Sequence, residues 1–328
     1  MKEKVKEIIK KYNLINTGDK IVLGVSGGPD SIAMLDILRQ LKSEMEFEIY
    51  VVHINHSIRG EDADEDEEYV KNYCRKYEIE CFTKKIDVPT IARTEKIGTE
   101  EAGRKVRYEY FEEILKETGS NKIAIAHNKN DNVETIIMHL LRGSGISGLK
   151  GIEPIRENKF IKPLIECDRQ EIEKYCEENN LQPRIDKTNF ENECTRNKIR
   201  NIVIPYIKKE FNPNIIETIT RLADVVSSED DFIENVSNEN YKKLLVIEEK
   251  NRIELKLKEF NLLDEVLKNR IILIATRKLF GSTQGIEKVN IEDIIKLCNN
   301  NIGNKFLMPN KNLKVLIQNK KINFIKID

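Results

Sequence analysis

Apolar and polar residues alternate along the first 140 positions in blocks that predict strands followed by helices. Short, β-branched apolar runs predict buried strands, at 21–25, 47–53, 81–88 and 122–126. Between and after them, apolar residues recur every three or four positions and predict helices, at 31–38, 62–77, 100–116 and 131–141. Because strand and helix alternate, we expect an α/β fold with a doubly wound, mainly parallel, Rossmann-like sheet.

The pattern changes after Pro205. Helical spacing across 214–226 places six apolar residues on one stripe, namely Ile215, Ile216, Ile219, Leu222, Ala223 and Val226. The segment 305–327 alternates around Pro309-Asn-Lys-Asn, which predicts a small hairpin. We therefore expect a first domain over residues 1–205 and a smaller, mostly helical domain over residues 206–328 with a short C-terminal β segment.

Composition limits the class of protein. A chain of 328 residues is typical of two or three domains. It contains no apolar run near the roughly 18–20 residues of a membrane span, and its first 15 residues predict a charged amphipathic helix rather than a signal peptide. We expect a cytoplasmic protein with no membrane partner.

Charge and cysteine usage exclude further classes. The six cysteines form no C-x-x-C pair, so we expect reduced structural thiols rather than a zinc or iron–sulfur site. The net charge of −1 argues against attraction of the whole molecule to nucleic acid. Local basic clusters remain, at Lys208-Lys209, Lys256 with Lys258, Lys268 with Arg270, and Arg277-Lys278.

The first predicted strand runs directly into Ser-Gly-Gly-Pro-Asp-Ser at 26–31. Gly27 and Gly28 permit positive φ and close approach of a ligand, and Pro29 suits the first turn of a helix. Free amides at a helix N-terminus favour an anion such as phosphate. A Walker A loop would need a lysine after the glycines, and a dinucleotide fingerprint would need G-x-G-x-x-G; neither is present.

This loop resembles the pyrophosphate loop of the ATP pyrophosphatase superfamily, whose members split ATP into AMP and pyrophosphate. The resemblance implies an adenine nucleotide alpha hydrolase-like fold, in which Ser26, Gly27, Gly28, Pro29 and Ser31 hold the phosphates. Asp30 would place a negative charge beside an anion, so we expect Mg²⁺ between them. Two plainer alternatives are a simple glycine turn and a helix-capping Asp30.

Further blocks are similar to those of tRNA(Ile)-lysidine synthetases in their order and spacing. The blocks are VVHINHSIRG (51–60), EEAGRKVRYEYFEE (100–113), AHNKNDNVETIIMHLLRGSGISGLKGI (126–152), KPLI (162–165) and DKTNFENECTRNKIRNIVIP (186–205). The tail GNKFLMPNKNLKVL (303–316) resembles the later domain of that family. Longer members carry an additional C-terminal domain, which we expect this chain to lack.

The resemblance implies a specific reaction. ATP adenylates C2 of the wobble cytidine, position 34, in an isoleucine tRNA with a CAU anticodon, and the ε-amine of L-lysine then displaces AMP to form lysidine. The product reads AUA instead of AUG. ATP and Mg²⁺ are the implied cofactors, tRNA and lysine the implied partners, and a homodimer is left open.

The third block supplies two acids. Asp131 and Glu134 are three residues apart in a predicted helix, so their carboxylates share a face. By resemblance they hold the substrate lysine, and one of them accepts a proton from the attacking amine. By the same resemblance Arg107 serves the substrate or the phosphates. The plainer alternatives are a solvated acidic face and a surface arginine paired with glutamate.

Histidines and arginines complete the candidate site. His53 and His127 end predicted strands and are candidate nucleotide contacts, although hydrogen-bonded packing residues are as common there. His53 and His56 lack a third ligand for a metal. Arg196 and Arg200 share a helix face and could bind either the lysine carboxylate or tRNA phosphate.

Three other segments carry weaker expectations. The glycine-rich stretch 142–148 predicts a mobile loop or a plain connector. The acidic run 61–68 predicts a solvated face. Asn130 stands where the family commonly carries an acid. If that acid binds metal or nucleotide in the family, its replacement by an amide would weaken the site in this chain.

Three rival functions follow. A tRNA thiolation enzyme of the same superfamily would need paired cysteines or a cluster-binding trio, which are absent from the sequence. The second rival is a tRNA-binding relative that retains the fold but has lost catalytic turnover, and only Asn130 supports it. An amide-forming synthetase would share the glycine loop but not the later blocks.

Overall fold

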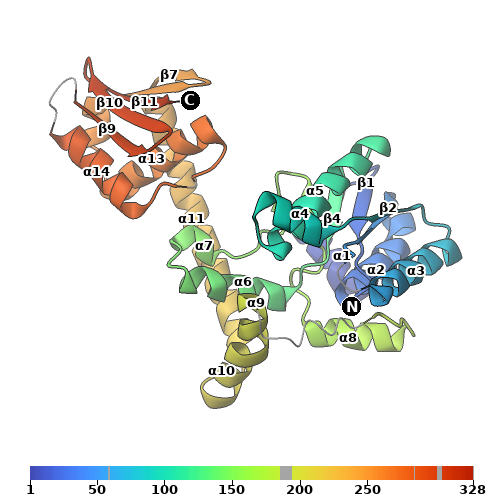
Figure 1. Ribbon diagram of the computed structural model, residues 1–328. Coiled ribbons are helices and arrows are strands. Elements are labelled where there is room, and N and C mark those ends of the chain that lie inside the picture. Colours follow the sequence, from blue (N-terminus) through green and yellow to red (C-terminus); the bar gives the residue numbers. More distant parts are fainter. Residues whose placement is uncertain (58–59, 185–193, 284, 301–304, 328) are drawn as a thin grey trace. The chain divides into compact units, whose positions relative to one another are not determined.

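The computed structural model describes residues 1–57, 60–184, 194–283, 285–300 and 305–327 (Figure 1). Its contacts divide the chain into two compact units, Met1–Asp224 and Val225–Asp328. The division falls after Asp224, whereas the sequence pattern suggested residue 205. Residues 186–193 of the fifth sequence block and 303–304 of the tail lie outside the described residues.

A six-stranded sheet forms the centre of the first unit, in the order β3-β2-β1-β4-β6-β5. Strands β1, β2, β3, β4 and β6 pair in parallel and β5 pairs antiparallel at the edge. Their bounds are β1 Lys20–Gly24, β2 Glu48–Asn55, β3 Cys81–Lys85, β4 Lys122–Ile125, β5 Ile155–Arg156 and β6 Phe160–Ile161. The expected doubly wound, mainly parallel sheet is confirmed.

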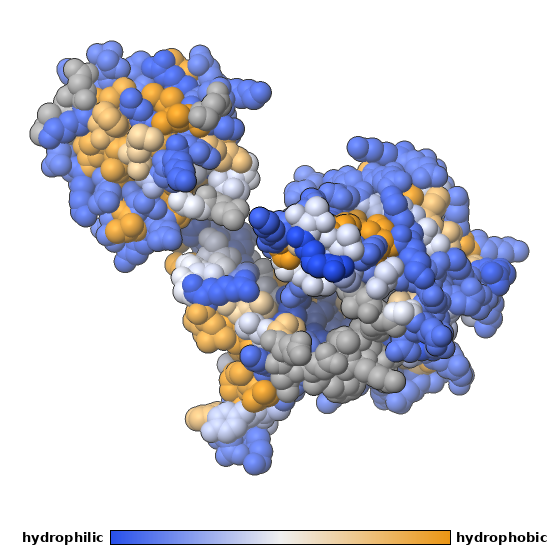
Figure 2. All heavy atoms as spheres, viewed as in Figure 1, coloured by the Kyte–Doolittle hydropathy of each residue, from blue (hydrophilic) through white to orange (hydrophobic). Residues whose placement is uncertain are grey.

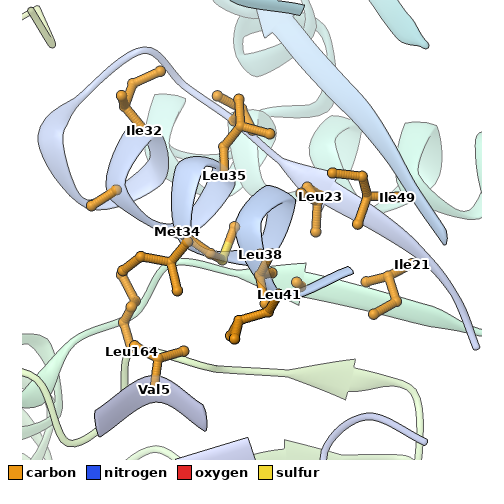
Figure 3. Packing of buried hydrophobic residues seen from close by; sticks show 14 of the residues in the cluster. Val5, Ile21, Leu23, Ile32, Met34, Leu35, Leu38, Leu41, Ile49 and Leu164 are labelled. Atoms are coloured by element: carbon orange, nitrogen blue, oxygen red, sulfur yellow. The ribbon is translucent and has the colours of Figure 1, made fainter. Parts of the chain in front are cut away.

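Helices cover both faces of this sheet (Figure 1). The helices of the first unit are α1 Lys2–Lys11, α2 Pro29–Met45, α3 Glu61–Lys76, α4 Val88–Glu95, α5 Thr99–Glu117, α6 Lys129–Leu141, α7 Ile146–Leu149, α8 Arg169–Glu178, α9 Thr195–Lys198, the π-helical turn η2 Ile199–Val203, α10 Ile204–Glu210 and the start of α11 Ile215–Leu244. Helices η2 and α10 and the start of α11 pack with α6 in a separate cluster. The apolar stripe of α2 packs against β1 (Figure 3): Leu35 and Leu38 lie beside Leu23 in a core that also includes Val5 and Leu164. This packing fixes the strand-to-helix turn at the carboxyl end of β1.

Two local predictions differ from the structure. The strand expected over 81–88 ends at Lys85, because Asp87 caps α4 by accepting a hydrogen bond from the Thr90 amide at 3.0 Å. The 142–148 stretch contains α7, which His139 holds through a 2.7 Å hydrogen bond between Nδ1 and the Gly148 carbonyl. Strands β5 and β6 were not predicted from the sequence, because each has only two residues.

The second unit contains a five-stranded antiparallel sheet in the order β7-β8-β11-β10-β9. Its strands are β7 Leu245–Glu249, β8 Arg252–Lys256, β9 Lys305–Asn310, β10 Leu313–Gln318 and β11 Lys321–Lys326, and its helices are α12 Leu257–Asn261, α13 Glu265–Phe280 and α14 Lys288–Asn299. The expected turn near Pro309 joins β9 to β10. The unit has more β structure than the sequence pattern suggested, because the short, charged strands β7 and β8 pair with each other and β8 also pairs with the C-terminal strand β11. Among the described residues, no helix has both the length and the apolar character needed to cross a membrane.

Candidate active site

A cavity of about 1180 Å³ lies at the carboxyl ends of β1, β2 and β4. This is the sheet edge at which parallel α/β folds bind ligands. Ten of the residues singled out from the sequence line it: Ser26, Gly28, Pro29, Asp30, Ser31, His53, Arg107, His127, Asp131 and Arg200. Three further candidates, Gly27, Glu134 and Arg196, are not among the lining residues.

The Ser26–Ser31 loop turns from β1 into α2 by a positive-φ glycine. Gly27 has φ +93°, a conformation that residues with a Cβ rarely adopt, and Gly28 is the N-cap of α2. The Ser31 hydroxyl donates to the Gly28 carbonyl at 2.9 Å and accepts from the Ser26 amide at 3.1 Å. The loop therefore presents the N-terminus of a 17-residue helix to the cavity, a site suited to an anion.

Asp30 lies in the first turn of α2 and does not cap it. Its Oδ1 accepts a 2.8 Å hydrogen bond from Asn128 Nδ2. Burial, and secondly the charge of Asp131, raise the pKa of the Asp30 carboxyl to about 6. Two carboxylates in one cavity thus lack full compensation by protein cations, and a bound divalent cation would relieve their repulsion.

A reciprocal capping box connects Asp30 to the acids of α6. Asn128 is the N-cap: its Oδ1 accepts from the Asp131 amide at 2.9 Å, while Asp131 Oδ2 accepts from the Asn128 amide at 3.2 Å. Asn128 is fully buried. One asparagine therefore orients both Asp30 and Asp131, and its N-x-x-D spacing is a signal that the sequence analysis missed.

Arg200 binds both acids of α6. Its Nε and Nη2 donate to Glu134 Oε1 and Oε2 at 2.6 and 2.7 Å, and Nη2 also donates to Asp131 Oδ1 at 2.8 Å. The Glu134 side chain is 1% exposed and that of Asp131 13%. Burial raises the pKa of Glu134, and the ion pair with Arg200 opposes that shift. Arg169, which the sequence analysis missed, lies 3.7 and 3.6 Å from the same two carboxylates.

The helix that carries Arg200 contains a π-helical turn. Helices α9, η2 and α10 follow one another without a break from Thr195 to Glu210, and Pro205 lies just after the π turn. Proline lacks the amide that an α-helix would use there, so a wider turn accommodates it. Arg196, one turn before Arg200, donates to Thr135 Oγ1 at 3.1 Å. Both arginines therefore attach this helix to α6.

The two histidines are held as neutral side chains. His53 Nδ1 donates to the Val25 carbonyl at 2.9 Å, which leaves Nε2 as an acceptor, and burial lowers the pKa of the ring. Burial also lowers the pKa of His127, to about 4, against a smaller opposing effect of Asp131. Over the ranges that the structure describes, no group of three or more His, Cys, Asp or Glu side chains is arranged as a metal site.

Arg107 reaches the cavity from α5. Its side chain is exposed to solvent, and desolvation by the surrounding protein lowers the pKa of the guanidinium. Among the described residues its charge is paired with no carboxylate. It is therefore a cation available to a bound anion, rather than the paired surface arginine that was the plainer alternative.

The departure at Asn130 has a structural explanation. Asn130 Oδ1 accepts a 3.0 Å hydrogen bond from the Arg169 amide at the start of α8. Asn130 lies outside the cavity lining. It joins the N-termini of α6 and α8, a task that an amide oxygen performs as well as a carboxylate oxygen.

The acidic run 61–68 is not simply a solvated face. Asp66 is buried, lines the cavity and pairs with Arg184 Nε at 3.0 Å, and Arg184 also contacts Asp62 and Glu65. Arg184 lies 118 residues beyond Asp66 in the sequence, so the charge pattern of α3 alone could not predict this pairing.

Lys162 of the KPLI block is also buried, and burial lowers its pKa to about 8.

Comparison with known proteins places the site in a family. Residues 1–207 match the PP-loop domain family. A tRNA(Ile)-lysidine synthase of Clostridioides difficile is 45% identical over 95% of this chain and 68% of that protein, and one of Petrotoga mobilis is 40% identical over 90% of each chain. This chain thus spans about two thirds of the length of the clostridial relatives.

A solved structure supports the fold. The U34-tRNA thiolase of Methanococcus maripaludis aligns with a TM-score of 0.57 and 18% identity, over 69% of this chain and 78% of that one. At that identity the likeness concerns the fold alone. The family follows from the sequence relatives: with a PP-loop domain over most of its length and 45% identity to a lysidine synthase, the chain belongs to the tRNA(Ile)-lysidine synthase family.

Proposed function

We propose that this protein uses ATP to join L-lysine to C2 of cytidine 34 in an isoleucine tRNA with a CAU anticodon, through an adenylated cytidine, with release of AMP and pyrophosphate. The observation that carries the proposal is that one cavity is lined both by the Ser26–Ser31 loop and by Asp131 and Arg200. An anion site and an acidic site for a cationic amine thus share one cavity. The reaction requires both.

The adenylation half uses the glycine loop. The amides at the start of α2 and the hydroxyls of Ser26 and Ser31 bind the phosphates, and Arg107 adds a positive charge as pyrophosphate leaves. Asp30 would hold Mg²⁺, which neutralises phosphate charge when bound; the raised pKa of the Asp30 carboxyl is consistent with this role. His53 Nε2 and the neutral His127 border the nucleotide.

The lysine half uses the acids of α6. Glu134 is 1% exposed and does not line the cavity, whereas Asp131 is 13% exposed and lines it, so Asp131 is the acid available to the ε-amine of lysine. When the amine nitrogen bonds to C2 and AMP leaves, the amine loses a proton that Asp131 can accept. Glu134 positions Arg200, and Arg196 secures the same helix. This assignment gives the two acids different roles, where the sequence analysis gave them one.

The tRNA partner fits the chemistry. The target cytidine lies in a single-stranded anticodon loop, so the base can enter the cavity without opening a duplex. The basic clusters at 208–209, 256–258, 268–270 and 277–278 remain predicted tRNA contacts. We expect the protein to work in the cytoplasm, and light scattering would test whether it forms a homodimer.

The test mixes the protein with Mg-ATP, labelled lysine and an unmodified isoleucine tRNA transcript with a CAU anticodon. A methionine tRNA with the same anticodon is the matched control. We expect label in the isoleucine tRNA only, with one AMP formed per lysine transferred. Label in neither tRNA, with tRNA binding intact, would contradict the proposal.

Two of the rival functions have no feature of this chain that supports them. A thiolation enzyme would need paired cysteines or a cluster-binding trio, which the sequence does not contain. A binding-only relative was supported by Asn130 alone, whose contact with Arg169 is structural.

A further inference from the structure

The helix from Thr195 to Glu210 exposes apolar side chains on its outer face. Ile202 and Tyr206 are 52% and 58% exposed, Phe211 at the C-cap of the helix is 74% exposed, and Lys198 and Lys209 are also exposed. We refer to these five residues as the α10 stripe. Figure 2 shows apolar atoms at the surface around α10. Within the described residues of the first unit, every exposed large apolar side chain lies between 140 and 222.

The exposure is not needed for folding. The opposite face of the same helix already supplies the core: Ile199 and Ile204 are buried against Val133 and Ile216. An amphipathic helix packed in this way normally carries polar residues on its outer face. Two exposed aromatic rings in that position therefore indicate a binding surface.

The charge around the stripe distinguishes between kinds of partner. Residues 194–224 contain six basic and three acidic residues, although the whole chain has a net charge of −1. Two of the acids are paired, Glu217 with Lys129 at 2.7 Å and Glu210 with Lys209 at 3.0 Å, at an exposed position. Protein interfaces are depleted in lysine, whereas single-stranded nucleic acid binds to aromatic rings set among cations.

The α10 stripe lies on the same helical segment as two residues of the cavity wall. Arg200 and Asn201 line the cavity, and Ile202 follows them in the sequence on the outer face. The rings of Tyr206 and Phe211 lie 5.9 Å apart at 63°, so their faces point in different directions and can each stack with a separate base.

We propose that the α10 stripe binds unpaired bases of the tRNA anticodon loop next to the base that enters the cavity. This inference rests on the proposed tRNA substrate. Tyr206 and Phe211 stack with bases, and Lys198 and Lys209 contact the flanking phosphates.

The test measures affinity of the full chain for a synthetic CAU anticodon stem–loop by fluorescence anisotropy. The variants are Tyr206→Ala, Phe211→Ala, the double variant and Tyr206→Phe. Phe232→Ala is the matched control, because Phe232 is 69% exposed but lies in an acidic sequence. The same stem as a blunt duplex without its loop is the control ligand.

We expect the double variant to bind the stem–loop at least tenfold more weakly, since loss of each base–aromatic stack weakens binding by roughly five- to a hundredfold. Tyr206→Phe and Phe232→Ala should remain within twofold of the wild type, and duplex binding should not change. Lys198→Ala with Lys209→Ala should lower the slope of log affinity against log salt by about two. Because all of these side chains are exposed, the Tm should remain that of the wild type.

Unchanged stem–loop affinity in the double variant would overturn the inference. A shift from dimer to monomer with unchanged RNA affinity would also overturn it and would identify the stripe as a contact between two copies of the chain. The binding assay is independent of catalysis. A wild type that makes no lysidine while the double variant loses affinity contradicts only the proposed function, and the reverse result contradicts only the stripe.

Discussion

Arg200 holds Glu134 through two parallel hydrogen bonds, from Nε to Oε1 at 2.6 Å and from Nη2 to Oε2 at 2.7 Å. This bidentate geometry is the strongest form of an arginine–carboxylate contact. The same guanidinium contacts Asp131, so a single arginine joins the acids of α6 to the helix that carries the α10 stripe. Glu134 thereby sets the position of a cation at the cavity wall.

Removing Glu134 should affect both stability and lysine use. Glu134→Ala removes the bidentate partner of the largely buried Arg200 and leaves it the single contact with Asp131, so we expect a loss of about 3 kcal/mol in the free energy of unfolding. The displaced arginine should raise the KM for lysine far more than the KM for ATP. Urea denaturation and steady-state kinetics measure the two effects. Glu178→Ala, which removes an exposed partner of Lys174, is the control and should change stability by no more than about 0.5 kcal/mol. Equal increases in both KM values would show that Glu134 does not act on lysine.

Asp30→Asn should separate catalysis from stability. Loss of the carboxylate should reduce AMP release at least a hundredfold if Asp30 holds Mg²⁺, and near-normal turnover would rule out that role. The variant should unfold at a higher temperature, because it removes a buried negative charge beside Asp131. Calorimetry should also show that Mg-ATP raises the Tm of the wild type more than that of the variant.

The pH dependence of stability follows from the same carboxyl. Its pKa is about 6 in the folded chain and 3.8 as the ordinary value, so the folded state binds more protons between these pH values. Stability should therefore decrease as pH rises from about 4 to about 6, by up to about 3 kcal/mol from this group. Comparing wild type and Asp30→Asn in urea at several pH values isolates the effect; parallel curves would contradict it.

His127 should stay neutral far below the usual pH of histidine protonation. Its pKa is lowered to about 4 by burial, so the unfolded chain binds the proton first and the histidine contributes stability that increases as pH rises from about 4 to about 6.5. NMR of the ring protons should show His127 titrating below pH 5. Titration near pH 6.5 would mean that the ring is solvated.

Gly151→Ala should destabilise the first unit. Gly151 has φ +73°, and an added Cβ would collide with Asn132 Oδ1 and approach Ile136 Cγ1 to 2.8 Å. Asn132 Oδ1 already accepts the Ile152 amide at 2.6 Å, so it cannot move freely. We expect a loss of about 1–3 kcal/mol. Gly145→Ala, with open space and φ −67°, is the control and should change stability little.

The sequence was sufficient for features that depend on neighbouring residues. The turn from β1 into α2 follows from a β-branched run, a glycine that adopts positive φ and a proline at the first helical position, all within 11 residues. Alternation of strands and helices along the chain predicted the parallel sheet, because each of these elements can also be recognised from neighbouring residues. Because β1, β2 and β4 run parallel, their carboxyl ends meet, and this placed Asp30, His53 and Asp131 at one edge.

Only the tertiary structure decided which charges meet. Arg200 pairs with Glu134 across 66 residues and Arg184 with Asp66 across 118, and nothing in either local pattern selects these partners over nearer ones. From the sequence alone, Asp131 and Glu134 had the same predicted role. In the structure both pair with Arg200, but the Glu134 side chain is almost completely buried and that of Asp131 is more exposed. Side-chain pairing depends on distances that long-range packing sets, whereas strands, helices and turns depend mainly on the local chain.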